Sequence, residues 1–252
     1  MMPILRIGPL SLPAPELAII LSVYAGLWLM ETWLRRQGRN PDAQSNLVLF
    51  SLGAFILGGR LGYIGQHWAA FAGNPADMLS LNRDLFDPFF GTAAAVVFAL
   101  VLAQRKQMPP ALTLTALSLF AAAVLVGADL AAYASGSAYG SASSLPWAVD
   151  LYGMRRHPSQ VYQLLLDLLG IGAWLLLLSR GGLAKSPALW LSFIALSTRF
   201  INAAFVAEGA ILPGGWRATQ AALLLGMLAI AWLLLRRGKS ATHPTPTTMC
   251  KE

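Results

Sequence analysis

The sequence predicts an all-α protein, a polytopic membrane helical bundle with about seven transmembrane helices. Hydrophobic residues make up 56% of the 252 residues and charged residues only 12%, whereas soluble domains carry about 25% charged residues. The charges are clustered, which leaves uncharged stretches long enough to cross a hydrocarbon core of about 30 Å as helices of about 20 residues. These stretches are apolar all round and lack the alternating pattern of barrel strands.

Seven apolar stretches follow one another along the chain, and each is expected to form a membrane-spanning helix. The polar stretch 73–87 is expected to be an interfacial loop, and 134–156, rich in Gly, Ser and Ala, a long exposed loop. We expect a single transmembrane domain over residues 1–239 and a disordered cytoplasmic tail, rich in Thr and Pro, over 240–252. The expected spans are about 17–34, 47–71, 88–103, 111–133, 158–178, 187–206 and 218–235.

Basic residues predict the orientation of the bundle. Lys and Arg are more frequent in the loops on one side, which contain Arg35, Arg105 and Arg236, and such loops face the cytoplasm. This places the N-terminus outside and the C-terminus in the cytoplasm, which requires an odd number of spans. The net charge of +7 fits basic loops that face anionic lipid. No basic stripe with interleaved aromatic residues indicates nucleic-acid binding.

Cysteine usage and ligand spacing indicate neither a disulfide framework nor a metal site. The single cysteine, Cys250, lies in the polar tail, so no disulfide can form within the chain. No spacing typical of a zinc site occurs, and the sequence suggests no cofactor.

The charged residues Arg60, Asp129 and Arg199 lie inside apolar spans. Each costs about 2.5–3.5 kcal/mol at mid-membrane on insertion scales, so each needs a polar environment. One interpretation is that the arginines reach the interface from the ends of their helices. The other is that they line a cavity and bind an anionic lipid head group, because a guanidinium matches the oxygens of a phosphate. An ion pair of Asp129 with Arg199 or with Arg60 fits both.

Two local patterns add candidate site residues. Gly59 and Gly62 flank Arg60 at helical spacing, and small residues let helices approach closely. The segment 155–162 opens the fifth span, and its Pro158 suits the first turn of a helix. Its histidine, His157, is either a structural hydrogen-bonding group or a catalyst. Ser159 lacks the Gly-x-Ser-x-Gly context of a serine hydrolase.

Several motifs, in order along nearly the whole chain, resemble those of the prolipoprotein diacylglyceryl transferase family. Residues 156–162, Arg-His-Pro-Ser-Gln-Val-Tyr, resemble the family signature RHPSQLYE, and residues 59–63 resemble its GARLGYV segment. Residues 7–12 resemble its IGPxSL run, residues 146–148 its VPWA, and residues 199–200 the start of its RFxxE segment. Gln220 lies where the family has SMGQ.

The resemblance implies a seven-span enzyme of the bacterial plasma (inner) membrane. The family transfers the diacylglyceryl group of phosphatidylglycerol to the lipobox cysteine of a prolipoprotein, and glycerol phosphate leaves. Expected partners are a phosphatidylglycerol-like phospholipid and either prolipoprotein signal peptides or other membrane subunits. The implied site has catalytic candidates His157 and Tyr133, head-group ligands Arg60, Arg199, Arg156 and Gln160, and the structural motif residues Gly59, Gly62, Pro158, Ser159 and Tyr162.

The sequence departs from the family pattern at polar positions of the site. Phe90 stands where the family has the histidine of a His-Gly-Gly motif. Asp129, or Ala128 if the alignment shifts by one residue, replaces an essential arginine. Ala203 replaces the glutamate of RFxxE, and Gln163 the glutamate after the signature tyrosine. Ala132 and Ser137 replace an asparagine and a glutamate, and Tyr24-Ala25-Gly26 matches the family only loosely.

These departures leave several functional hypotheses open. A degenerate relative would keep the fold and lipid binding more than the catalysis, acting as a binding module or as a non-catalytic subunit of a larger membrane complex. An active transferase with a rewired site would use Arg60, Arg199, His157 and Tyr133. A transporter is disfavoured, because no inverted repeat and no pair of broken helices is visible.

Overall fold

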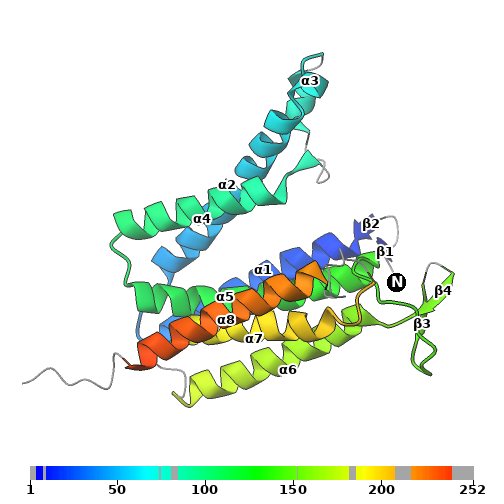
Figure 1. Cartoon of the computed structure of the whole chain (residues 1–252). Helices are drawn as coiled ribbons and strands as arrows, with labels where there is room; N and C mark the ends of the chain where they lie inside the picture. Colours follow the sequence, from blue (N-terminus) through cyan, green and yellow to red (C-terminus); the bar gives the residue numbers. More distant parts are fainter. Residues whose placement is uncertain are drawn as a thin grey trace, which may run out of the picture. The chain divides into compact units, whose positions relative to one another are not determined.

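The computed structural model describes residues 4–7, 10–73, 75–80, 85–151, 153–181, 186–207 and 217–239, and the predicted tail 240–252 lies outside them (Figure 1). The all-α class is confirmed, because helices form most of this part of the chain. The helices are α1 (Ala14–Arg36), α2 (Asp42–Gln66), α3 (Trp68–Phe71), η1 (Pro75–Leu79), α4 (Pro88–Arg105), α5 (Pro110–Ser135), α6 (Ser159–Ser179), α7 (Pro187–Asn202) and α8 (Ala218–Lys239).

Within the described residues, six helices are long and apolar enough to cross a membrane: α1, α2, α4, α5, α6 and the Ala218–Arg236 part of α8. The protein is thus a multi-pass membrane protein. Helix α7 has 16 residues, about 24 Å at 1.5 Å per residue, which is shorter than a hydrocarbon core of about 30 Å. The number of seven spans and the orientation therefore stay predictions.

Two small antiparallel sheets lie outside the spans and were not expected from the sequence. Strand β1 (Ile4–Ile7) pairs with β2 (Leu10–Pro13) before α1. Strand β3 (Val149–Leu151) pairs with β4 (Met154–Arg156) inside the expected loop 134–156. The turn of this second hairpin contains Gly153 at φ +73°, a conformation that glycine adopts without a Cβ clash.

The chain divides into two compact units, of which the first comprises residues 1–29 and 118–252. Glycines let its helices approach closely. A Cβ on Gly127 of α5 would lie 2.1 Å from Cβ of Ser22 on α1, and one on Gly170 of α6 would lie 2.6 Å from Cγ2 of Ile194 on α7. Helix α7 also packs against α8. Helices α6 and α7 and the part of α5 from Ser118 onward belong to this unit.

The second unit comprises residues 30–117 and is built on the packing of α2 against α4. Here too glycines form the contact. A Cβ on Gly58 would lie 2.3 Å from Cβ of Ala94, and one on Gly62 would lie 2.4 Å from Cβ of Phe90. The glycines around Arg60 therefore form the face of α2 that receives α4.

Asp87 starts α4 as its N-cap and lies in the interfacial stretch outside the predicted spans. Its Oδ1 accepts hydrogen bonds from the amides of Phe89 at 2.8 Å and Phe90 at 3.0 Å, and its Oδ2 accepts one from Nε2 of Gln66 at 2.7 Å. The hydrogen bond from the Phe90 amide, followed by that from Gln66, lowers the pKa of the Asp87 carboxyl below 3.8. The carboxylate therefore stays ionised into acidic conditions.

We expect the cap to protect the first turn of α4 down to pH values below 3.8. A carboxyl with a lowered pKa stabilises the fold above its ordinary pKa, and this stabilisation is lost as the pH falls through the lowered value. Hydrogen exchange of the Phe89 and Phe90 amides measures this. Asp87→Ala should remove the protection at every pH, while Asp87→Asn, which caps without titrating, should keep it. Loss of wild-type protection at a pH well above 3.8 would contradict the assignment.

Candidate functional site

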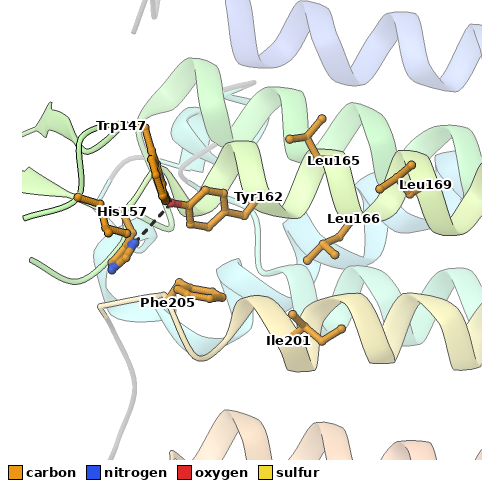
Figure 2. A pocket seen from close by; sticks show the side chains of 9 residues that line it. Trp147, His157, Tyr162, Leu165, Leu166, Leu169, Ile201 and Phe205 are labelled. Atoms are coloured by element: carbon orange, nitrogen blue, oxygen red, sulfur yellow. Dashed lines mark hydrogen bonds between the residues drawn. The ribbon is translucent and has the colours of Figure 1, made fainter. Parts of the chain in front are cut away.

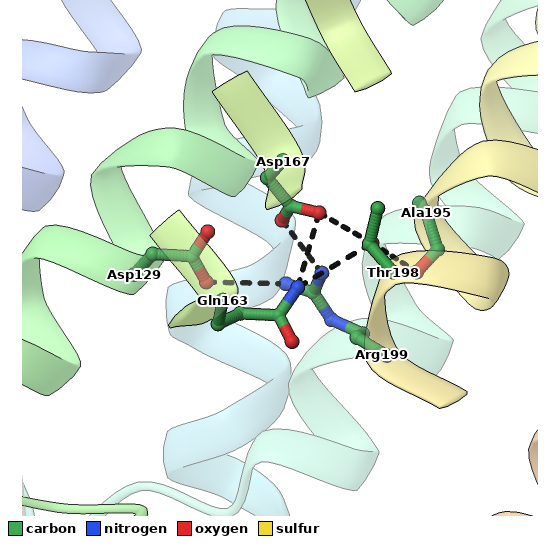
Figure 3. A network of polar contacts seen from close by, with 6 residues as sticks. All are labelled: Asp129, Gln163, Asp167, Ala195, Thr198 and Arg199. Carbon is green, nitrogen blue, oxygen red and sulfur yellow. Dashed lines mark hydrogen bonds and ion pairs between the residues drawn. The ribbon is translucent and has the colours of Figure 1, made fainter. Parts of the chain in front are cut away.

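A cluster of polar side chains crosses the first unit where α5, α6 and α7 meet (Figure 3). Arg199 on α7 lies between two carboxylates. Its Nη1 is 2.8 Å from Oδ2 of Asp167 on α6, and its Nη2 is 3.5 Å from Oδ1 of Asp129 on α5. Of the two ion pairs that the sequence allowed for Asp129, the structure contains the one with Arg199.

Asp167 is the best-satisfied member of this cluster. Besides Arg199, its Oδ1 accepts hydrogen bonds from Oγ1 of Thr198 at 2.5 Å and from Nε2 of Gln163 at 3.0 Å. The residue is only 1% exposed. Because burying a charge is costly unless it is paired and hydrogen-bonded, these three donors explain how a carboxylate persists here.

Asp129 is less well satisfied than Asp167. Its residue is 5% exposed, and among the described residues its Oδ2 is buried with no hydrogen-bond partner. Two carboxylates surround one guanidinium, so the cluster carries one negative charge in excess when all three groups are ionised. The Arg199 guanidinium is therefore neutralised from within the bundle.

Sequence reasoning missed Asp167. The signal was present, because Asp167 is the one charged residue in the predicted span 158–178, and a charge in a span indicates an internal partner. Gln163, which departs from the family pattern, lies one helical turn before Asp167 and donates to that carboxylate.

Arg60, in the second unit, has its hydrogen-bond donors directed at backbone carbonyls. Its Nε donates to Met78 at 2.9 Å, its Nη1 to Leu85 at 2.9 Å and its Nη2 to Asp77 at 2.5 Å. The residue is 8% exposed, and its guanidinium lies 5.6 Å from the ring centres of Phe71 and Phe86. Arg60 thus binds backbone carbonyl groups in the segment that connects α2 to α4.

The signature segment 156–162 anchors the connection that precedes α6. The hydroxyl of Ser159 donates to the carbonyl of Ala138 at 2.7 Å, and Nε2 of Gln160 donates to that of Ser137 at 2.9 Å. Both residues are buried. Pro158 is the N-cap residue of α6, one position before the expected first turn. These contacts hold the chain that follows α5 against the start of α6.

Arg156 folds back onto the same connection. Its Nη1 donates to the carbonyl of Gly140 and its Nε to that of Leu151, both at 3.3 Å. Its guanidinium lies 4.8 Å from the centre of the Tyr139 ring. The donors of Arg156 are therefore directed at its own loop.

His157 and Tyr162 lie together at one end of an apolar groove in the first unit (Figure 2). The Tyr162 hydroxyl accepts a hydrogen bond from Nε1 of Trp147 at 2.7 Å and lies 3.4 Å from Nδ1 of His157. The groove has a volume of about 470 Å³, within the range of about 300–1,000 Å³ typical of small-molecule sites. It is lined by Leu145, Trp147, His157, Tyr162, Leu165, Leu166, Leu169, Ile201 and Phe205.

The remaining candidate positions are not among the residues that line this groove. Tyr133, on α5, is 45% exposed. Ala203, where the family pattern has a glutamate, is buried. Phe90, in the second unit, packs its ring against Gly62 of α2 and lines a cavity of about 720 Å³ with Ala94 and Val97. That cavity is lined almost wholly by apolar side chains.

Comparison with known proteins assigns this arrangement to a family. Residues 3–236 match the family model described as prolipoprotein diacylglyceryl transferase. A phosphatidylglycerol–prolipoprotein diacylglyceryl transferase of Ruegeria pomeroyi is 31% identical over 88% of this chain and 84% of its own length. Proteins with the same description from Rhizobium meliloti and Trichormus variabilis are 28% and 24% identical, covering 94% and 93% of this chain and 92% and 90% of their own lengths. The chain belongs to the prolipoprotein diacylglyceryl transferase family.

Proposed function

We propose that this chain is a non-catalytic member of its family, which keeps the membrane bundle and a lipid-binding groove but not diacylglyceryl transfer. The observation that carries the proposal is the contact of Arg199 with both Asp167 and Asp129. Relatives described as phosphatidylglycerol–prolipoprotein diacylglyceryl transferases act on an anionic phospholipid. An arginine bound by two carboxylates is a poor ligand for such a head group.

Electrostatics supports this argument. Two unit charges of like sign 4 Å apart repel by about 4 kcal/mol at an effective dielectric constant of about 20, and each 1.4 kcal/mol is about tenfold in binding or rate. A phosphate near Arg199 would lie beside carboxylates that already contact the guanidinium. The two other arginines of the candidate site, Arg60 and Arg156, direct their donors to backbone carbonyls.

Proton transfer is also poorly served at the position of the family histidine. A thiol nucleophile must lose its proton, which requires a base within hydrogen-bond reach. The Phe90 ring neither donates nor accepts a proton. It packs against Gly62, which has no side chain to occupy this space. This position therefore serves helix packing in the second unit.

The apolar groove supports retained lipid binding. Aliphatic side chains such as Leu165, Leu169 and Ile201 line its length, and the polar groups of His157, Tyr162 and Trp147 lie at one end. This pattern fits an acyl chain whose head group lies beside the histidine. We propose that the protein occupies the bacterial plasma membrane, and that prolipoprotein signal peptides or other membrane subunits are its protein partners.

The test is expression in bacteria depleted of their own transferase, with lipidation of a reporter lipobox peptide as the readout. The wild-type chain is expected to give no lipidation, although it accumulates in the membrane. The double variant Phe90→His plus Asp129→Arg is expected to give a measurable gain, because it supplies a proton acceptor and gives the cluster a net positive charge. The Ruegeria relative serves as the positive control. Lipidation by the wild-type chain would refute the proposal.

The His157–Tyr162 contact favours a second candidate, an active transferase with a rewired site. In that case the imidazole, 3.4 Å from the Tyr162 hydroxyl, would take the proton of the thiol. The same assay separates the two candidates. An active wild type that loses lipidation on His157→Gln, at unchanged abundance, would establish the second candidate.

A further inference from the structure

We propose that Asp129, together with Asp167, binds one monovalent cation, a proton or Na⁺, between α5, α6 and α7. This inference concerns the charge state of the same cluster, and it holds whether or not the chain is catalytic. Charge balance and an unsatisfied buried oxygen are the two observations that carry it.

The charge balance leaves one negative charge without a partner. Asp167 and Asp129 contribute two negative charges and Arg199 contributes one positive charge. Asp167 is the closer partner of the guanidinium, at 2.8 Å against 3.5 Å for Asp129. Asp129 therefore carries the excess charge. Because an uncompensated charge in the interior of a membrane protein is costly, a bound monovalent cation makes the cluster neutral, whereas a divalent cation would overcompensate it.

The position of the unsatisfied atom agrees with this assignment. Oδ2 of Asp129 is buried and, in the part of the chain that the structure describes, receives no hydrogen bond, while the whole residue is 5% exposed. Buried polar atoms in native proteins nearly always have a partner. An oxygen in this position suits either a proton on the carboxyl group or a hard cation, which prefers oxygen ligands.

Among the described residues of α5, α6 and α7, Arg199 is the one basic residue. Among the described residues of the first unit, Asp167 is the charged residue of α6 and Arg199 that of α7. Helix α1, which packs on α5 at Gly127, contributes an acidic residue, Glu16, in this unit. Thr198 and Gln163 donate their hydrogen bonds to Asp167. Near α8, which packs on α7, Arg217 donates to the carbonyl of Val206 and Arg236 contacts the ring of Trp232. The missing positive charge is therefore assigned to a cation from solution.

The experiment uses the full chain in lipid nanodiscs, compared as wild type, Asp129→Asn and Asp150→Asn, the last being a matched control at an exposed carboxylate of β3. Infrared spectroscopy detects the carbonyl stretch of a protonated carboxylic acid. Thermal unfolding is followed across pH in sodium chloride and in choline chloride at equal ionic strength. The wild-type infrared spectrum and sodium titration decide the question even if Asp129→Asn fails to fold.

A bound proton predicts an infrared band that Asp129→Asn removes and Asp150→Asn keeps, with wild-type stability that falls as the pH rises and is indifferent to sodium. Bound Na⁺ predicts no such band, and a rise in unfolding temperature in sodium over choline that is lost in Asp129→Asn. Either result supports the site and identifies the cation. A wild-type protein with no band and no sodium dependence overturns the proposal.

Discussion

Replacing Asp167 by asparagine is expected to destabilise the protein by about 3–5 kcal/mol, the cost of removing one partner of a buried ion pair. The asparagine would leave Arg199 with Asp129 alone, at 3.5 Å. It would also place an amide where Thr198 and Gln163 now donate to a carboxylate. Unfolding in mixed detergent micelles, followed by circular dichroism, measures the free-energy change.

Asp129→Asn is the matched control for Asp167→Asn, because it also converts a buried carboxylate near Arg199 to an amide. It should cost far less, since the 2.8 Å contact of Arg199 with Asp167 remains and the excess negative charge is removed. A smaller loss of stability in Asp167→Asn than in Asp129→Asn would show that Asp129, and not Asp167, is the more important partner of Arg199.

Gly140→Ala is expected to have the second-largest effect, because the new methyl group has no space. A Cβ at this position would lie 2.2 Å from the carbonyl oxygen of His157 and 2.9 Å from its carbonyl carbon. These are backbone atoms and cannot rotate away, so the connection between α5 and α6 must shift. Overpacking of this kind typically costs about 1–3 kcal/mol. The shift should also break the contact of Arg156 with the Gly140 carbonyl, at 3.3 Å.

Limited proteolysis of residues 134–156, together with detergent unfolding, tests the Gly140 prediction. Faster cleavage within this connection and a lower unfolding midpoint are expected. Gly172→Ala on α6 is the control, because a Cβ there meets nothing within 4 Å and alanine favours a helix by up to about 1 kcal/mol over glycine. Equal cleavage rates in the two variants would contradict the tight approach of Gly140 to His157.

The helices could be predicted from the sequence because one physical requirement dominates them. Backbone polar groups in lipid must be satisfied within the segment, so a long apolar stretch such as 111–133 predicts α5 (Pro110–Ser135) to within two residues. The hairpin of β3 and β4 could not be predicted in this way. Its strands have three residues each, and its place depends on contacts with distant residues, such as the pairing of Ala142 with Arg156.

The site was predicted in part, for a similar reason. Charges inside apolar stretches revealed Arg199 and Asp129 as residues that need partners, and the pairing of the two is one of the alternatives that the sequence allowed. The sequence pattern could not rank Arg60 against Arg199 as the partner, because that choice depends on how the helices pack. Asp167 could have been found by the same rule, as a lone carboxylate within the span 158–178.

Arg60 donates hydrogen bonds to three carbonyl groups, and this gives the arginine a structural role that is independent of any substrate. Its five donors fit a planar fork, and three of its hydrogen bonds tie Asp77, Met78 and Leu85 to α2. A chain without transferase activity would still require the motif Gly-Arg-Leu-Gly, residues 59–62, to assemble its α2–α4 hairpin. The presence of this motif in a sequence therefore indicates the fold. Catalytic activity has to be judged from the side chains around Phe90, Asp129 and Arg199.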